Sequence, residues 1–279
     1  MTLQTALLQG AEILGKAAIP SPRLTAEVLL CHALGCERAY LYAHDADELK
    51  QLPWIHYGRY LNDRLQGKPA QYITHRQEFY GRDFYVDPNV LIPRPETEHL
   101  VEAAISYTKE TPGARALDVG TGSGAIAITL ALETGGEVLA SDISLPALAV
   151  AERNRRTYRA QIRFFASDLL AAVRPASIDL LVSNPPYVPA ADAANMQTEV
   201  RDWEPQTALF AGPSGLEIYQ RLIVAAESAI KPGGRLLLEL GYQSLEAVRE
   251  MLATRWGDIV VDHDLAGWPR VIAAAKRSR

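Results

Sequence analysis

The sequence has little cysteine, no long apolar run and no excess of positive charge. Cys31 and Cys36 are the only cysteines in 279 residues, and His32 is the one histidine near them. Three such residues do not predict a metal site, so we expect no bound metal. So few cysteines also indicate a reducing compartment. No apolar run approaches the roughly 20 residues that cross a bilayer, which predicts a cytoplasmic protein without membrane contact. A net charge of -5 argues against a broad basic surface for nucleic acid.

Helical patterns occupy the first 72 residues. Apolar residues recur at helical spacing over residues 3–14, with Gly15 expected to help end that helix. A second helix is predicted to begin with Ser21 as N-cap and Pro22 in its first position, and a third covers residues 53–66. The residues expected to face the core are Leu3, Leu7 and Leu14, then Leu24, Val28 and Cys31, then Trp54, Tyr57, Leu61 and Leu65. These patterns predict a small helical bundle.

Aromatic and β-branched residues then run from Tyr72 to Val86, with Gly81 as a turn, and predict a hairpin or extended linker. From residue 94 onward, strands and helical stretches alternate, which is typical of a doubly wound, mostly parallel α/β sheet of the Rossmann-like kind. The predicted strands are residues 115–119, 137–141, 162–166, 178–183, 235–240, 258–262 and 271–275. The segment 264–270 is too short for a crossover helix, so one of the last two strands is expected to be antiparallel.

The alternation suggests three parts. They are a helical domain of residues 1–72, a hairpin linker of residues 73–93 and a seven-stranded domain of residues 94–279. Nothing in residues 1–72 resembles a nucleotide site, so we expect those helices to recognise the substrate.

A glycine-rich turn follows the first predicted strand. It is formed by Asp118, Val119, Gly120, Thr121, Gly122, Ser123 and Gly124. Glycine lets the backbone pass close to a ligand that a side chain would block. The spacing differs from the Gly-x-Gly-x-x-Gly of dinucleotide sites. The Asp118 carboxylate suits a ligand that carries an ammonium and a sulfonium, and S-adenosylmethionine carries both.

Two further carboxylates follow later strands. Asp142 ends the second strand about twenty residues on, where an acidic side chain can accept both ribose hydroxyls. Asp168 follows the third strand, where it can accept from an adenine amino group. Each of them could instead cap a following helix. Three acids at successive strand ends, together with the glycine turn, favour a site for S-adenosylmethionine.

The fourth strand is followed by Asn184-Pro185-Pro186-Tyr187. Two prolines fix their own φ and restrict the residue before each of them, so Asn184 has little backbone freedom. The loop offers an amide side chain, carbonyl acceptors and one aromatic face, which together suit an NH2 group. The alternative is a purely structural proline-rich turn.

The order of these motifs resembles S-adenosylmethionine-dependent methyltransferases that modify planar NH2 groups, on adenine in DNA or on glutamine in protein. The stretches that narrow this to the HemK-type release factor glutamine N5-methyltransferases (the PrmC family) are residues 67–73, 78–81, 90–98 and 204–212. This resemblance covers essentially the whole chain. It implies that the substrate is the glutamine of the Gly-Gly-Gln motif in class 1 peptide chain release factors. Leu169 departs from the family, which commonly has an aromatic residue there to cover the adenine face.

The resemblance also implies roles for the loop. The Asn184 oxygen and the Pro185 carbonyl accept the two N–H bonds of the substrate amide, and Tyr187 packs on that amide. Pro186 completes the substrate site, and Asn184 and Leu169 also border the cofactor. No acid, base or metal is needed at the loop, and we expect a monomer.

Three alternatives stay open at this point. One is glutamine methylation of a ribosomal protein by the same mechanism. A second is adenine methylation in DNA, which the acidic balance disfavours. The third is a module that binds S-adenosylmethionine without turnover, which would not need an intact Asn-Pro-Pro-Tyr loop.

Overall fold

The computed structural model describes residues 1–277, and their contacts divide them into two units. The first unit joins Met1–Arg76 to Gln197–Trp203, and the second joins Gln77–Met196 to the residues from Glu204 onward. The predicted C-terminal boundary at residue 279 lies outside the described residues. No helix in the described part of the chain is long and apolar enough to cross a membrane.

Short helices packed around leucine and alanine side chains build the first unit. They are α1 (Leu3–Lys16), α2 (Pro22–Leu34), α3 (Arg38–Ala43), α4 (Gln51–Leu65), α5 (Ala70–Thr74) and, much later in the chain, α9 (Thr198–Trp203). The largest buried side chain of this core is Tyr57, which is 0% exposed. The three predicted helices are therefore present, and three shorter ones join them.

Several local predictions for these helices were wrong. Ser21 precedes α2 with a φ of 48°, and its side chain makes no capping hydrogen bond. Gly15 lies in the last turn of α1 rather than beyond it. Three of the residues expected in the core are exposed: Leu24, Trp54 and Leu65. Other residues of the same helices form the buried faces. Helical spacing alone allows either choice.

Residues 72 and 73 were also assigned wrongly. Tyr72 and Ile73 belong to α5, which starts after Pro69, and both side chains are buried. An aromatic and a β-branched residue favour a strand when considered alone. Here their burial outweighs that preference.

The helix α9 belongs to the first unit although it lies more than 120 residues after α5. The buried Arg64 on α4 makes an ion pair with Glu199 on α9. A Cβ built on Gly67, whose φ is 91°, would lie 3.3 Å from the indole nitrogen of Trp203. The end of α4 is therefore shaped to receive a segment from far along the chain.

The second unit is built on one sheet. In spatial order, and counting only residues 1–277, its strands are β10 (Trp256–His263), β11 (Pro269–Lys276), β9 (Ile230–Glu239), β6 (Ile178–Ser183), β3 (Ala116–Val119), β4 (Val138–Asp142) and β5 (Ile162–Ala166). β11 runs antiparallel to β9 and to β10, and the pairs from β9 to β5 are parallel. The doubly wound fold and the antiparallel strand near the C-terminus are confirmed.

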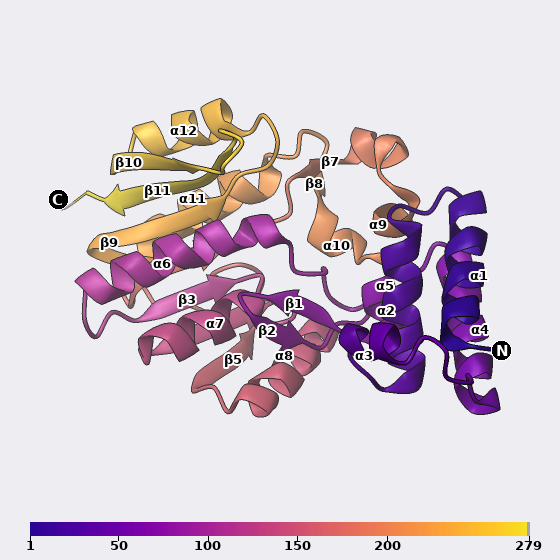
Figure 1. Ribbon diagram of the computed structural model, residues 1–279. Coiled ribbons are helices and arrows are strands. Elements are labelled where there is room, and N and C mark those ends of the chain that lie inside the picture. The colour runs from indigo at the N-terminus through magenta and orange to yellow at the C-terminus, as the bar shows by residue number, and fades with distance from the viewer. Residues whose placement is uncertain (278–279) are drawn as a thin grey trace. The chain divides into compact units, whose positions relative to one another are not determined.

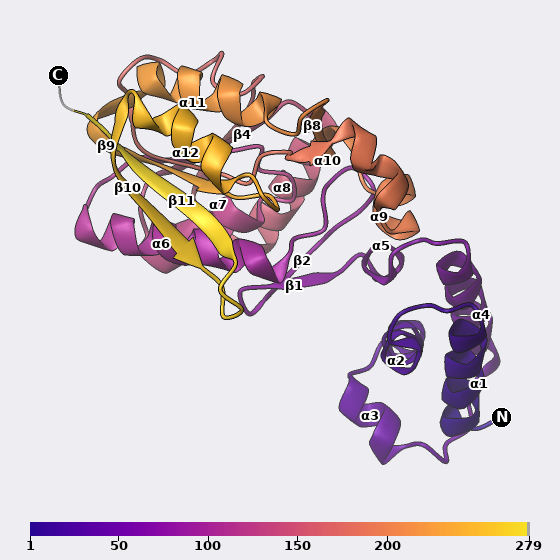
Figure 2. The same cartoon turned by 90° about the horizontal axis from the view of Figure 1, so that it is seen from above.

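Helices cover both faces of this sheet. One face carries α6 (Glu98–Glu110), α7 (Ala125–Thr134) and α8 (Leu145–Tyr158), and the other carries α11 (Glu217–Ala229) and α12 (Leu245–Ala253). Figure 1 shows this layering, and Figure 2 shows α11 and α12 on the opposite side of β9 from α6. The inner strands β3 and β6 are thus buried on both faces, as their near-continuous apolar sequences predict, whereas the edge strands β5 and β10 keep exposed residues.

A short hairpin opens the second unit. It consists of β1 (Gln77–Phe79) and β2 (Arg82–Phe84), with Tyr80 and Gly81 in its turn. Both turn residues have positive φ, 54° and 69°, which is the geometry of a tight two-residue hairpin. The predicted hairpin with Gly81 as its turn is confirmed.

The remaining elements are short, and two of them, α10 and β8, contribute to the cavity described below. They are η1 (Pro95–Thr97), β7 (Val188–Pro189), η2 (Ala190–Asn195), α10 (Gln206–Leu209) and β8 (Phe210–Gly212). β7 pairs with β8 in parallel.

Gly10 offers a test of the packing in the first unit. A Cβ on this residue of α1 would lie 1.9 Å from the Tyr57 hydroxyl oxygen, whereas a Cβ on Gly58 of α4 would meet nothing within 4 Å. We expect Gly10→Ala to lower the free energy of unfolding by about 1–3 kcal/mol through overpacking. Gly58→Ala, the matched control, should raise it by about 0.5–1 kcal/mol because alanine favours a helix. Urea denaturation followed by circular dichroism measures both, and equal effects would contradict this account.

Candidate active site

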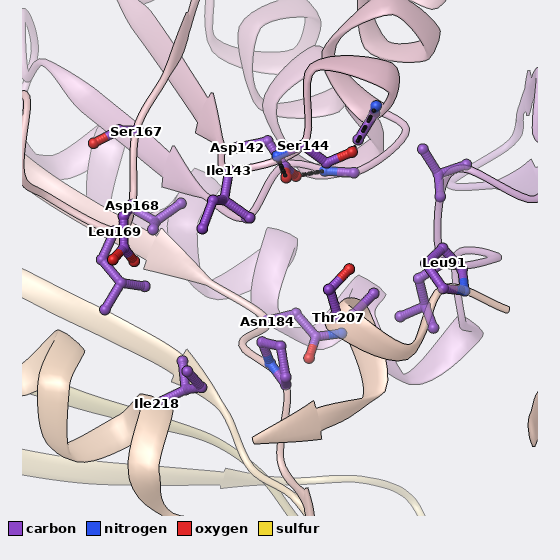
Figure 3. A pocket seen from close by; sticks show the side chains of 18 of the residues that line it. Leu91, Asp142, Ile143, Ser144, Ser167, Asp168, Leu169, Asn184, Thr207 and Ile218 are labelled. Carbon is purple, nitrogen blue, oxygen red and sulfur yellow. Dashed lines mark hydrogen bonds between the residues drawn. The ribbon is translucent and has the colours of Figure 1, made fainter. Parts of the chain in front are cut away.

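A cavity of about 290 Å³ lies at the carboxyl ends of the parallel strands. Its lining residues within the described chain are Asn89, Val90, Leu91, Val119, Gly120, Gly122, Asp142, Ile143, Ser144, Ala147, Ser167, Asp168, Leu169, Asn184, Pro186, Pro205, Thr207, Ala208, Phe210, Ile218 and Arg221. Figure 3 shows Asp142, Asp168 and Asn184, each from a different strand end, around this space. The second unit therefore collects side chains from three predicted motifs in one place.

The glycine turn forms one wall. Gly120 and Gly122 have φ of 76° and 54°, in the left-handed region that favours glycine, and a Cβ on either would project into open space. The backbone N–H groups of Gly120 and Thr121 donate to the Ser141 carbonyl, at 2.9 and 3.0 Å. The turn is thus held against β4 while its glycines leave room at the cavity.

Asp118 lies behind this wall and is 1% exposed. The Thr121 hydroxyl donates to its Oδ2 at 2.6 Å, and its Oδ1 is buried without a partner among residues 1–277. Burial raises the pKa of Asp118 to about 7, against the lowering effect of the Thr121 hydroxyl, and the charge of Asp142 raises it further. An unsatisfied acceptor beside an open turn is available to a cationic ligand group.

Asp142 ends β4 and borders the cavity. Its Oδ2 accepts the N–H of Gly122 and its Oδ1 accepts the N–H of Ser144, both at 2.9 Å. Ser144, and not Asp142, caps α8 by accepting the Ala147 N–H. The carboxylate is therefore fixed in orientation by two backbone donors and still reaches the cavity, which suits a binding group.

Asp168 and Leu169 stand at the end of β5, on another side of the cavity (Figure 3). Asp168 makes an ion pair with Arg221 on α11, with 2.7 Å between Oδ2 and Nη2. Leu169 has a φ of 49°, an uncommon conformation for a residue with a branched side chain. Its leucine side chain lines the cavity at the position where the family commonly has an aromatic residue.

The Asn184–Tyr187 loop follows β6. The Asn184 amide borders the cavity, and its Nδ2 donates to the Thr97 hydroxyl at 3.2 Å. Pro186 also lines the cavity, whereas Pro185 is buried. Tyr187 is not among the described residues that line the cavity, and its ring contacts Gly241, where a Cβ would lie 2.7 Å from the tyrosine ring. The structure thus brings Asn184 and Pro186 to the cavity lining.

Many lining residues had no role in the sequence-based prediction. Ile143, directly after Asp142, is 64% exposed and borders the cavity. Its position after a strand-ending acid was an available signal, since an exposed isoleucine there can cover a planar ligand. Arg221 lies on a helix with no motif, so the sequence carries no sign of it.

Glu204, which is 4% exposed, connects two further segments of the cavity lining. Its Oε2 accepts the Ile92 N–H at 3.1 Å, and its Oε1 makes an ion pair with Arg94. The segments around residues 90 and 205, both lining the cavity, are therefore joined by one buried carboxylate. Within residues 1–277, no group of three or more His, Cys, Asp or Glu side chains is arranged to hold a metal ion.

Solved structures show what the sheet domain is similar to. A methyltransferase from Pyrococcus furiosus is 19% identical, with a TM-score of 0.53, over 72% of this chain and 91% of that one. The 16S rRNA N2 G1207 methyltransferase of Thermus thermophilus, solved in complex with AdoMet and guanosine, is 20% identical, with a TM-score of 0.52, over 72% and 50%. These likenesses establish a shared methyltransferase fold.

Sequence comparisons cover both units. Residues 5–74 match the PrmC N-terminal domain, and residues 98–200 match the methyltransferase small domain. A release factor glutamine methyltransferase of Koribacter versatilis is 46% identical over 99% of both chains. One from Nitratidesulfovibrio vulgaris is 39% identical over 99% of this chain and 95% of that one. The chain belongs to the release factor glutamine methyltransferase family.

Proposed function

We propose that this protein transfers a methyl group from S-adenosylmethionine to the side-chain nitrogen of the glutamine in the Gly-Gly-Gln motif of class 1 release factors. The observation that carries the proposal is the Asn184 amide, held at the same cavity as the glycine turn and Asp142. The names of the relatives support the release factor as substrate. The net charge of -5 supports a protein substrate without direct contact to nucleic acid.

The residues present fit S-adenosylmethionine. Gly120 and Gly122 leave space beside their backbone at the cavity. The Oδ1 atom of Asp118, which has no partner among the described residues, suits the ammonium group of S-adenosylmethionine. Asp142 would accept from the ribose hydroxyls and Asp168 from the adenine amino group, with Leu169 packing beside it. When bound, S-adenosylmethionine supplies an electrophilic methyl group on its sulfonium. Every group named comes from one copy of the chain, so the proposed site needs no second copy, and we propose that the protein acts as a monomer.

The chain's contribution to the chemistry is orientation. An amide nitrogen is a poor nucleophile because its lone pair is delocalised into the carbonyl. In our proposal, the Asn184 oxygen and the Pro185 carbonyl accept hydrogen bonds from the two N–H groups of the substrate amide. These bonds direct the nitrogen lone pair at the methyl group. Orientation of this kind contributes on the order of 7–11 kcal/mol to catalysis. Tyr187, whose ring also contacts Gly241, would pack on the substrate amide.

Mass spectrometry of a purified class 1 release factor tests the reaction. After incubation with the enzyme and S-adenosylmethionine, we expect a gain of one methyl on the Gly-Gly-Gln glutamine. In the same assay, Asn184→Ala should lower turnover by about 10²- to 10³-fold, because it deletes one preorganised partner. Cofactor affinity should fall only modestly.

Asn184→Asp serves as the matched variant, since its carboxylate keeps an oxygen in the same place. We expect it to retain a measurable part of the turnover that Asn184→Ala loses. If both variants turn over equally well, the Asn184 oxygen is not an acceptor in the reaction. The loop is then a structural turn.

Asp142 tests the cofactor half of the site. Asp142→Ala should weaken S-adenosylmethionine binding by about 1.5–3 kcal/mol, because hydrogen bonds to a charged group are lost. Isothermal titration calorimetry measures the affinity, and thermal denaturation of the same sample checks that the turn at Gly122 survives. Unchanged affinity would make Asp142 a structural residue that only fixes the Gly122 and Ser144 backbone.

The division of labour between domains is also part of the proposal. We propose that residues 1–72 recognise the release factor, residues 73–93 link, and residues 94–279 bind the cofactor and carry out the transfer. Deleting the helical domain should leave cofactor binding largely intact. Methylation of whole release factor should fall much more than methylation of a short Gly-Gly-Gln peptide. Equal losses on both substrates would argue against a recognition role.

A further inference from the structure

A buried acid stands directly behind the Asn184 amide. Glu239 ends β9, the strand that pairs in parallel with β6, and the register of this pair places Ser183 beside Leu238. The next residues along the two strands are Asn184 and Glu239, so both lie at the same edge of the sheet. Glu239 is 3% exposed. Its Oε2 has no hydrogen-bond partner within residues 1–277.

Thr97 interacts with both residues, because its hydroxyl contacts the Asn184 amide and also lowers the pKa of Glu239. It comes from η1, in the proline-rich stretch that begins at Pro93, and is 5% exposed. Its hydroxyl accepts the Asn184 Nδ2–H at 3.2 Å. Neither Thr97 nor Glu239 is among the described residues that line the cavity, so both act on the site only through Asn184.

The charge state of Glu239 decides which way this chain of hydrogen bonds runs. An ionised carboxylate can only accept, so the Thr97 hydroxyl gives its hydrogen to Glu239 and uses its lone pair for the Asn184 NH2 group. The Asn184 oxygen is then left for the cavity. A protonated Glu239 can donate a hydrogen bond to the Thr97 hydroxyl. The Thr97 hydrogen is then free to bond the Asn184 oxygen, so the amide group can flip and present its NH2 group to the cavity.

Other groups around Glu239 set the balance between these two states. Burial raises the pKa of Glu239 to about 7, hydrogen bonding to the Thr97 hydroxyl and the Asn184 amide lowers it, and the charges of Glu96 and Arg270 act in opposite directions. Glu96 comes from η1 and Arg270 from β11. Two phenols also face this acid: Tyr187 from the loop and Tyr219 from α11.

The phenol of Tyr219 fixes the backbone of the acid. Its hydroxyl donates to the Glu239 carbonyl at 2.7 Å and accepts the Gly241 N–H at 3.0 Å. Burial is the largest cause that raises the pKa of Tyr187, to about 12, so this phenol stays neutral near pH 7. Of the groups packed around Asn184 and Thr97, Glu239 therefore changes its charge near neutral pH, as Asp118 does beside the glycine turn.

We infer that Glu239 is a positioning residue, which acts through Thr97 to present the Asn184 oxygen, and not its NH2 group, to the substrate amide. This inference rests on the proposed function, because it assigns the orientation of the acceptor in that reaction. It also gives a role to the segment 93–98, which the substrate and cofactor contacts leave without one.

The test is the pH dependence of single-turnover methylation of a release factor by the wild type and by Glu239→Gln. The wild-type rate should fall below pH 7 as Glu239 takes up a proton. The glutamine cannot ionise, so its rate should be independent of this titration and about 10-fold below the wild type at pH 8, as expected for one lost ordering hydrogen bond. The two rates should converge near pH 6. Affinity for S-adenosylmethionine should change by less than about twofold, since Glu239 stands outside the cavity lining.

Stability provides a readout that does not depend on activity. Because the pKa of Glu239 is raised from 4.5 to about 7 in the folded state, stability that is fully present at low pH is lost as the pH rises from 4.5 to about 7. Glu239→Gln avoids that cost, so its melting temperature should rise relative to the wild type between pH 5 and pH 8. This shift also shows that the variant is folded.

Thr97 and Asp179 supply the matched variants. Thr97→Val removes the connecting hydroxyl and should slow methylation about 10-fold, while Thr97→Ser keeps the hydroxyl and should restore the rate. Asp179→Asn changes a carboxylate at the opposite end of β6, which pairs with Lys231 at the start of β9. It should leave the pH profile unchanged.

Three outcomes would overturn the inference. A Glu239→Gln enzyme with the wild-type rate and the wild-type pH profile means that the acid does not orient Asn184. A normal rate in Thr97→Val means that the connection through the hydroxyl is absent. If the wild type binds the cofactor but does not methylate the release factor, the proposed function itself fails, which this assay separates from failure of the variant alone.

Discussion

Parallel pairing of β6 between β3 and β9 decides where the polar groups of the site stand. The three strands run in one direction, so the turns that leave their carboxyl ends meet at one edge of the sheet. The Ser183 hydroxyl donates to the Val119 carbonyl at 2.7 Å, which joins the end of β6 directly to the start of the glycine turn. A shift of one residue between β6 and β9 would turn the Glu239 side chain to the other face and separate it from Asn184.

Two acids at the same edge of the sheet lower the stability of the folded state when they are ionised. Asp118 and Glu239 are both almost fully buried, each has one oxygen without a partner in the described chain, and burial raises the pKa of each to about 7. Acids in this state reduce the stability of the folded protein as the pH rises through their titration. Two buried acids with raised pKa values near one cavity are typical of a functional site, since a purely structural core avoids such groups. In the proposed function, Asp118 would act on the cofactor and Glu239 on the substrate amide through Asn184.

The segment after the Asn184–Tyr187 loop serves both units. It leaves β7, passes into α9 of the first unit, and returns as the stretch from Pro205 that lines the cavity. Glu204 begins this return and binds the backbone of Ile92 and the side chain of Arg94. The family-specific stretch near residue 94 therefore has a structural task as well as a place beside Asn184.

The sequence by itself determined the sheet, its antiparallel strand and the strand ends that carry Asp142, Asp168 and Asn184, because these follow from apolar runs, glycine spacing and paired prolines, which are local signals. It also identified the family, through stretches such as residues 90–98. Only the tertiary structure decided that α9 belongs with the first unit.

Burial and side-chain direction were likewise decided in three dimensions. The Tyr187 ring contacts Gly241, which lies 54 positions later, and Arg221 reaches Asp168 from a helix without a motif. The hydrogen bond between Asn184 and Thr97 joins residues 87 positions apart. Such contacts depend on strand order and packing between distant segments, so no local pattern of residues records them.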